Sequence, residues 1–230
     1  MTEQNSLTAA APALAPPVPI RIDFVSDVSC PWCAIGLASL QQALANIGAA
    51  VHAEIHFQPF ELNPQMPPEG ENATEHLMRK YGIDTSQVAT NRDVIRTRGE
   101  PLGVSFKMDN SSRVYNTFDA HRLLHWAELE GRHVALKQVL LRAYFSDGDD
   151  VSEHGVLQRL AAEAGLDGVE AGRLLASDTY AAEVRAQEHL YLERGIRSVP
   201  ATIINGRHLI SGGQPPEAFE QALRQLIKEA

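Results

Sequence analysis

The chain is poor in cysteine, with only two among its 230 residues, Cys30 and Cys33. A disulfide between them would close a very short loop, and closing a short loop adds little stability. Small secreted proteins that depend on disulfides carry more of them, whereas a chain of this length buries a core large enough to fold without them. The shortage therefore excludes a disulfide-stapled scaffold.

Basic residues are also scarce. The 20 Lys and Arg stand against 29 Asp and Glu, which gives a formal net charge of −9. Such a chain repels nucleic-acid phosphates and anionic lipid headgroups, so we expect no nucleic acid and no membrane surface as its main partner. We also find no run of about 18 apolar residues, the length that a membrane-spanning helix needs, and we expect no membrane span.

The N-terminal segment lacks the basic start of a secretory signal. Residues 1–19 contain no Lys or Arg, include Glu3 and carry four prolines. This composition predicts a disordered leader over residues 1–19, with a signal peptide as the minor alternative. We therefore expect a cytoplasmic protein, where structural disulfides are rare.

A strand, a helix and a second strand follow the leader. Ile20–Ser26 alternates apolar and polar residues, apolar residues recur at helical spacing after Cys33, and Val51–Pro64 alternates again before prolines end it. This order and length predict a βαβ unit. The two cysteines lie at its strand-to-helix turn.

The middle of the chain changes to helical periodicity, with most segments ending at a glycine. The C-terminal part predicts a strand, an Asn205-Gly206 hairpin turn, a strand and a helix. Terminal β segments around a helical middle favour an insertion, since the strands at both ends can form one sheet. We therefore predict an α/β domain over 20–72 and 195–230, with an inserted all-helical subdomain over 73–194.

The position of the cysteines suggests thiol chemistry. A helix N-terminus stabilises negative charge, so Cys30 is predicted to be the nucleophile. Cys33, one helical turn further on and more shielded, is placed to resolve a mixed disulfide formed on Cys30. Pro31 suits the first helical turn, and Trp32 adds an apolar surface beside the sulfur.

Two other interpretations of the pair stay open. Cys-x-x-Cys supplies two thiolates at zinc-ligand spacing, and two neighbouring cysteines can also be inert core residues. The chain has no second Cys-x-x-Cys, and the spacing of His52 and His56 is stretched in a strand, so we predict no metal site and favour redox chemistry.

Pro200, in the stretch "GIRSVPATIING", is the second informative residue. Proline is tolerated at the first residue of a strand, so Pro200 can simply mark the start of a strand. If the Val199-Pro200 bond is cis, the backbone of Val199 is instead available to an extended peptide or cofactor across the cysteines.

The motifs together resemble a known family. "CPWC" after "DFVSDVS", the distant "SVPATIING" and the helical stretch between them resemble the DsbA-like oxidoreductases of the thioredoxin superfamily. "PFELNP", "NTFDAHRL", "AYFSDG" and "SGGQPPEAF" are similar to the FrnE-type subfamily, relatives of 2-hydroxychromene-2-carboxylate isomerase and kappa-class glutathione transferases. The resemblance covers about residues 20 to 228 and implies a thioredoxin-like fold in which Pro200 is a cis-proline facing the cysteines.

The resemblance also implies a function. It indicates a thiol-disulfide oxidoreductase with a redox-active disulfide, no tightly bound cofactor, and a protein or small-molecule thiol or disulfide as partner. The alternative is a glutathione-dependent isomerase or transferase acting on a small aromatic or polyketide-type substrate. Those relatives generally carry serine at the position of Cys30 and an acidic residue near Gly213-Gln214, so glutathione is expected here as a co-substrate at most. A homodimer is left open.

Five polar residues are further candidates. Asp27, Asn63, Asn116 and His121 are considered for the active-site cleft, although Asn116 and His121 would lie far apart around one helix. Asp23, on the first strand, could relay a proton to Cys33 if it is buried.

Overall fold

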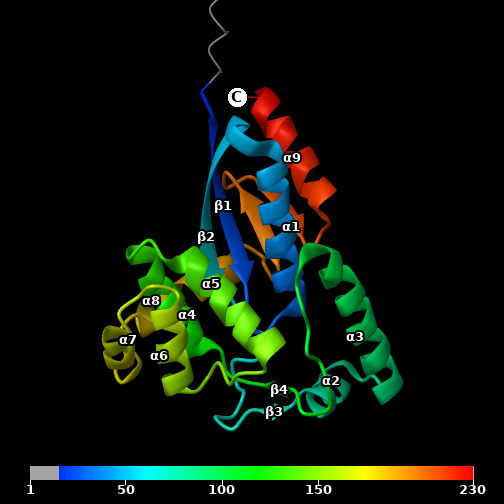
Figure 1. Ribbon diagram of the computed structural model, residues 1–230, viewed down its shortest axis with the longest axis vertical. Helices are drawn as coiled ribbons and strands as arrows, with labels where there is room; N and C mark the ends of the chain where they lie inside the picture. The colour runs from blue at the N-terminus through cyan, green and yellow to red at the C-terminus, as the bar shows by residue number, and fades with distance from the viewer. Residues whose placement is uncertain (1–15, 230) are drawn as a thin grey trace, which may run out of the picture.

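A computed structural model describes residues 16–229. Four strands form one mixed sheet in the order β2-β1-β5-β6 (Figure 1). Their bounds are β1 Val18–Ser26, β2 Val51–Pro59, β5 Ala201–Ile204 and β6 His208–Ser211. Because β1 begins at Val18, the last two residues of the expected leader belong to the sheet; residues 1–15 of that leader lie outside the described residues. Strand β2 ends at Pro59, earlier than the sequence pattern predicts.

The two ends of the chain meet at β1. On one side β1 pairs in parallel with β2, in a register that places Phe24 beside Phe57. On the other side it pairs antiparallel with β5, with Phe24 opposite Thr202. The parallel pair needs a crossover, and helix α1 (Pro31–Ile47) supplies it. The predicted βαβ unit and the single sheet built from both chain ends are therefore present.

The β5–β6 hairpin follows the sequence prediction. Asn205 and Gly206 have φ values of 51° and 67°, the left-handed conformation that these residue types tolerate in a two-residue hairpin turn.

Helices α1 and α9 (Pro216–Glu229) cover one face of this sheet (Figure 1). Alternate residues of β1, namely Ile20, Ile22 and Phe24, point into the core beneath α1 and are almost fully buried. Burying each such side chain contributes about 1.5–3 kcal/mol. The intervening residue Val25 faces the other way and packs with Tyr191. This alternation decides which side chains of β1 can reach the cysteines.

The region between β2 and β5 is mainly helical. Its elements are β3 Glu71–Asn72, α2 Ala73–Tyr81, α3 Thr85–Gly99, η2 Glu100–Leu102, β4 Arg113–Val114, α4 Phe118–Leu129, α5 His133–Arg142, η3 Ala143–Asp147, α6 His154–Glu163, α7 Gly168–Leu175 and α8 Ala181–Glu193. Strands β3 and β4, of two residues each, pair with each other, so the region predicted to be all-helical also contributes to a small two-stranded sheet. Helices α2 and α3 lie on one side of the molecule and α4 to α8 on the other (Figure 1).

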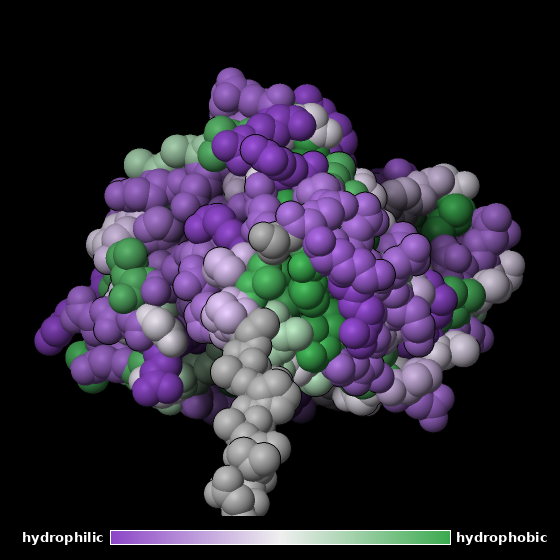
Figure 2. All heavy atoms as spheres, turned by 90° about the horizontal axis from the view of Figure 1, so that it is seen from above, coloured by the Kyte–Doolittle hydropathy of each residue, from purple (hydrophilic) through white to green (hydrophobic). Residues whose placement is uncertain are grey.

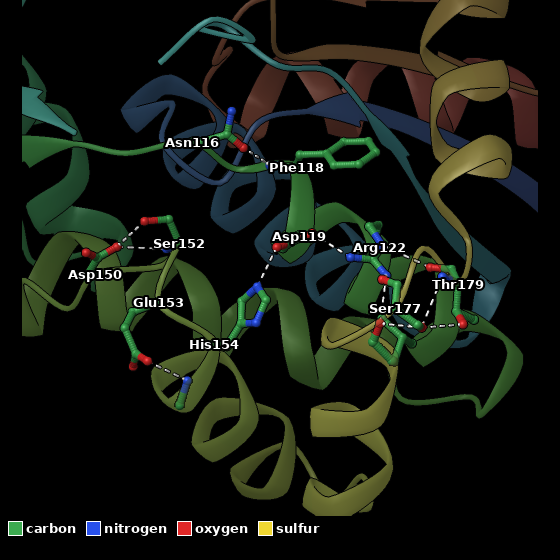
Figure 3. Close-up of polar contacts among 12 residues, drawn as sticks. Asn116, Phe118, Asp119, Arg122, Asp150, Ser152, Glu153, His154, Ser177 and Thr179 are labelled. Carbon is green, nitrogen blue, oxygen red and sulfur yellow. Dashed lines mark hydrogen bonds and ion pairs between the residues drawn. The ribbon is translucent and has the colours of Figure 1, made fainter. Parts of the chain in front are cut away.

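A buried arginine holds the second helical group together. The guanidinium of Arg122 donates to Asp119 at 2.7 Å, to the carbonyl of Leu174 at 2.7 Å and to that of Thr179 at 2.9 Å. It also donates to the carbonyl of Ser177 (Figure 3). Helix C-terminal carbonyls have no partner within the helix, and charge-assisted hydrogen bonds are the strong ones. Arg122 therefore ties the end of α7 to α4.

The helical region shares a core with the sheet. Ile95, Phe106, Leu141 and Phe145 belong to the same hydrophobic cluster as Phe24. A second cluster lies within α4 to α7. The boundaries 20–72, 73–194 and 195–230 stay predictions.

Helix α1 is the most apolar helix of the core. By length and composition alone, the stretch Pro31–Ala50 could cross a membrane, but half of it is buried in the fold, as expected of a core helix. The end of the molecule away from the cysteines is mostly hydrophilic, with a hydrophobic area near the centre of the view and smaller ones at its sides (Figure 2).

Candidate active site

The two cysteines occupy the start of α1, as the sequence predicts. Cys30 is the N-cap residue in extended conformation (φ −93°, ψ 112°), and Pro31 is the first helical residue. The N–H of Cys33 donates to the carbonyl of Cys30 at 3.0 Å, which closes the first turn. No side chain caps this helix, so its positive end is left to the Cys30 thiol.

Both thiols are free and shielded from solvent. Cys33 is fully buried, whereas Cys30 keeps 4% of its surface exposed. Burial raises the pKa of the Cys33 thiol well above its usual value, and the neighbouring Cys30 raises it further, while Lys137 acts in the opposite direction. The pair thus consists of an outer sulfur at the helix end, with slight exposure, and a fully buried inner sulfur whose ionisation is disfavoured.

The loop before β5 comes back to the cysteines. The Cys30 thiol donates to the carbonyl of Val199 across 3.7 Å, and the Val199–Pro200 bond is cis. A Cβ on Gly36 would stand 3.1 Å from Cγ of Pro200. The residues expected as supports, Pro31, Trp32, Val199 and Pro200, therefore lie around the cysteine turn.

A cavity of about 950 Å³ opens beside Cys30. It lies between the start of α1, helices α2 and α3, the β3–β4 region and the loop that carries Val199. Apolar residues form much of its wall, among them Trp32, Leu77, Tyr81, Ile95 and Tyr115. Sequence reasoning missed this wall, because the residues of α2 and α3 carry no motif.

The charges that line the cavity oppose the net charge of the chain. Its basic residues are Lys80, Arg92, Lys107, Arg113 and Arg197, and its acidic ones are Glu61, Asp109 and Asp149. A locally positive cleft concentrates anions even on a negative protein. The cavity therefore suits a partner with at least one carboxylate.

Asn63 is the one polar cleft candidate that lines this cavity. Its Oδ1 accepts from Lys80 Nζ at 2.7 Å and lies 3.0 Å from Nε2 of His76. These contacts join the loop after β2 to α2 and hold Lys80 at the cavity wall.

The other three cleft candidates lie elsewhere. Oδ1 of Asn116 accepts from the N–H of Phe118 at 2.9 Å, at the start of α4 (Figure 3). Asp27 and His121 are both buried and face each other at 3.8 Å. None of Asp27, Asn116 and His121 is among the residues that line the cavity.

Asp27 instead supports the loop beneath the cysteines. Its carboxylate accepts from the N–H groups of Ser29 at 3.1 Å and Leu62 at 2.7 Å. Burial alone would raise its pKa, but His121 and these two N–H groups outweigh burial and lower the pKa of Asp27 below its usual value. The carboxylate is thus a buried anion that fixes the turn.

Asp23 does not reach Cys33. Its side chain accepts from Gln58 at 2.9 Å and from Arg21 at 2.7 Å. Because residues alternate along a strand, Asp23 shares the face of Val25, opposite the core that contains Cys33. A proton relay from Asp23 to Cys33 is therefore wrong.

Lys137 is the buried ionisable group that sequence reasoning overlooked. It is fully buried on α5, and Cys33 is the group whose charge acts on it most strongly. A signal was present, because Lys137 falls between the buried positions Leu136 and Leu140 on the apolar face of the helix.

Within residues 16–229, no group of three or more His, Cys, Asp or Glu side chains is arranged to hold a metal ion.

Comparisons with known proteins agree with this geometry. Residues 21–224 match the family described as a DSBA-like thioredoxin domain. The uncharacterised protein YwbO of Bacillus subtilis (strain 168) is 28% identical over 205 residues, which cover 89% of this chain and 96% of that protein.

Two solved structures are similar in fold. A probable DsbA oxidoreductase, SCO1869 from Streptomyces coelicolor, is 34% identical with a TM-score of 0.86, over 92% of this chain and 91% of that one. The cytosolic disulfide reductase DsbM of Pseudomonas aeruginosa, solved with glutathione, is 17% identical with a TM-score of 0.61, over 91% of this chain and 99% of that one. The second likeness concerns the fold alone.

Proposed function

Because the chain belongs to the DSBA-like thioredoxin family, we propose that it catalyses thiol-disulfide exchange through Cys30 and Cys33. The observation that carries the proposal is the meeting of three groups. The Cys30 thiol at a helix N-terminus and the Val199 backbone line one cavity, and Cys33 is buried one turn behind Cys30. This is the arrangement that a two-step exchange requires.

Cys30 acts as the nucleophile. Its sulfur stands at the uncapped start of α1 and borders the cavity from which a disulfide can approach. The thiolate attacks one sulfur of the substrate, a mixed disulfide forms on Cys30, and the other substrate sulfur leaves as a thiolate. Cys33 then attacks Cys30 and releases the second half of the substrate.

The residues around the pair position the substrate. Val199 presents its carbonyl, now occupied by the Cys30 thiol, which an extended peptide or thiol can take over. Trp32 gives an apolar wall next to the sulfur. Pro31 starts the helix without an N–H to satisfy, and Pro200 packs against Gly36 of α1.

The cavity favours a small acidic thiol or disulfide, with glutathione as the first candidate co-substrate. Its surplus of basic side chains matches the carboxylates of glutathione, and the similar fold of DsbM has been solved with that molecule. No feature of the cavity favours the isomerase or transferase over disulfide exchange. A cytoplasmic location and a homodimer stay predictions.

Single-cysteine variants test the proposal. The protein is equilibrated with defined ratios of reduced and oxidised glutathione, and free thiols and mass are measured. We expect a reversible two-electron transition in the unmodified chain, a stable mixed disulfide in Cys33→Ser and no adduct in Cys30→Ser. Non-covalent retention of one glutathione per chain, with no Cys30–Cys33 disulfide, would instead indicate the glutathione-dependent isomerase.

A further inference from the structure

Lys137 occupies an unfavourable position for a lysine. Its side chain is fully buried, and its Nζ has no hydrogen-bond partner among the described residues. Nζ lies over the ring of Phe57, 5.5 Å from its centroid. An amine removed from water without a hydrogen bond costs free energy in either protonation state, and the charged state costs most. Buried polar groups without a hydrogen-bond partner are rare in native proteins, so packing alone does not explain a lysine at this position.

The ionisable groups around Lys137 belong to the candidate active site. Cys33, Asp27 and Cys30, in that order, are the groups whose charges act on it. Asp27 is itself engaged by His121 of α4. On the same helix, His133 lies one turn earlier and makes a 2.8 Å hydrogen bond with the carbonyl of Ile55. Of these groups, Cys33 acts most strongly on Lys137 and must lose a proton before it can resolve the mixed disulfide.

Burial favours the uncharged form of both Lys137 and Cys33. Burial lowers the pKa of Lys137 from its ordinary value. Burial also raises the pKa of Cys33, and Lys137 is the group that opposes this most. The charge of each group nevertheless acts on the other. If the proton moved from sulfur to nitrogen, the two opposite charges would stabilise each other, since Cys33 raises the pKa of Lys137 and Lys137 lowers that of Cys33.

We propose that Lys137 accepts the proton of Cys33 when Cys33 resolves the mixed disulfide on Cys30. The neutral amine takes the thiol proton and becomes an ammonium, and the Cys33 thiolate attacks the sulfur of Cys30. The Cys30–Cys33 bond forms, the bond from Cys30 to the substrate breaks, and the substrate sulfur leaves with the electron pair. The substrate disulfide is the oxidant, and the reverse reaction returns the proton to Cys33.

This inference rests on the proposed dithiol function, and its test separates the two. Reduced protein is mixed in a stopped-flow instrument with one equivalent of dithiobis(nitrobenzoate), which releases coloured thiolate twice. The first release reports attack by Cys30, and the second reports resolution by Cys33. Both are followed from neutral to alkaline pH.

The variant is Lys137→Met, which keeps a long apolar side chain. Its matched control is Gln138→Met, an exposed change on the same helix. In Lys137→Met we expect an unchanged first release and a second release slowed about 100-fold at neutral pH, the usual scale of general-base catalysis. The second rate should then rise with pH, because hydroxide must take the proton. The control should match the unmodified protein in both phases.

A melting curve guards against a merely structural effect. Since Met removes an unpartnered buried amine, Lys137→Met should melt no lower than the unmodified protein. If it fails to fold, NMR of isotope-labelled lysine in the unmodified protein replaces it. A buried Nζ resonance that shifts when the cysteine pair is oxidised supports the proposal, and the lack of such a shift overturns it.

The remaining outcomes are also decisive. A second release with unchanged rate and pH profile in Lys137→Met overturns the role of Lys137 and leaves the dithiol function intact. A chain whose cysteines release no coloured thiolate in either phase overturns the proposed function, and the role of Lys137 with it.

Discussion

Gly213 and Trp32 touch backbone to backbone beside Cys30: a Cβ placed on Gly213 would stand 2.9 Å from the main-chain oxygen of Trp32. This contact fixes the loop after β6 against the first turn of α1. It gives the "SGGQP" stretch a structural reason, since only a residue without a side chain allows this approach.

Gly213→Ala should therefore disturb the cysteine turn. Overpacking at a rigid contact costs about 1–3 kcal/mol, so we expect a loss of that size in the free energy of unfolding and slower attack by Cys30. Urea denaturation and the first release of coloured thiolate measure the two effects. Ser211→Ala, an exposed change on β6, is the control, and equal behaviour of both variants would contradict the prediction.

The buried pair of Asp27 and His121 should make stability depend on pH. The pKa of Asp27 is lowered in the folded protein, so its ionised form favours folding. Its contribution is complete above the unfolded value of about 3.9 and is lost as the pH falls through the lower folded pKa. Removing one member of a buried pair costs about 3 kcal/mol, so Asp27→Asn should lose about that much at neutral pH. Denaturation at neutral and acidic pH measures the difference, which should shrink in acid; a constant difference would speak against this linkage.

Arg122 should matter for stability far more than an exposed arginine. Arg122→Ala removes four charge-assisted contacts and leaves buried carbonyls without a donor, so we expect a loss of about 3 kcal/mol. Arg173→Ala breaks an exposed ion pair with Glu170 and should cost less than about 1 kcal/mol. Thermal melting compares them, and similar melting temperatures would refute the role of Arg122 as an anchor.

The basic lining of the cavity should select acidic substrates. Arg197 lines the cavity near Val199, and Arg197→Gln should slow exchange with glutathione disulfide about 5-fold while leaving a neutral hydroxyethyl disulfide unaffected. Arg207→Gln, on the β5–β6 turn, is the control. The effect should weaken with salt, and an equal loss with both disulfides would exclude charge selection.

The sheet, the cysteine turn and the mainly helical middle were predictable because they depend on local pattern. The two-residue alternation in Ile20–Ser26 predicts a strand, and the helical spacing of apolar residues after Cys33 predicts a helix. The polar candidates could not be placed in this way. Asp23 points away from Cys33 because alternate residues of β1 face opposite sides of the sheet, and Asp23 shares the side of Val25. Asp27 contacts His121 only in the folded protein, where α4 packs under the turn.

Lys137 and the two-residue strands escaped prediction for other reasons. Lysine is almost never fully buried, so its place on the apolar face of α5 was not read as a site. Strands β3 and β4 are too short to show a period and exist only by pairing with each other.

Ile95 and Phe145 both line the cavity and both belong to the main hydrophobic core. The wall that a substrate touches is therefore the outer layer of the core itself. A molecule in the cavity extends that core, and its binding energy adds to the folding energy of the entire sheet and helical region.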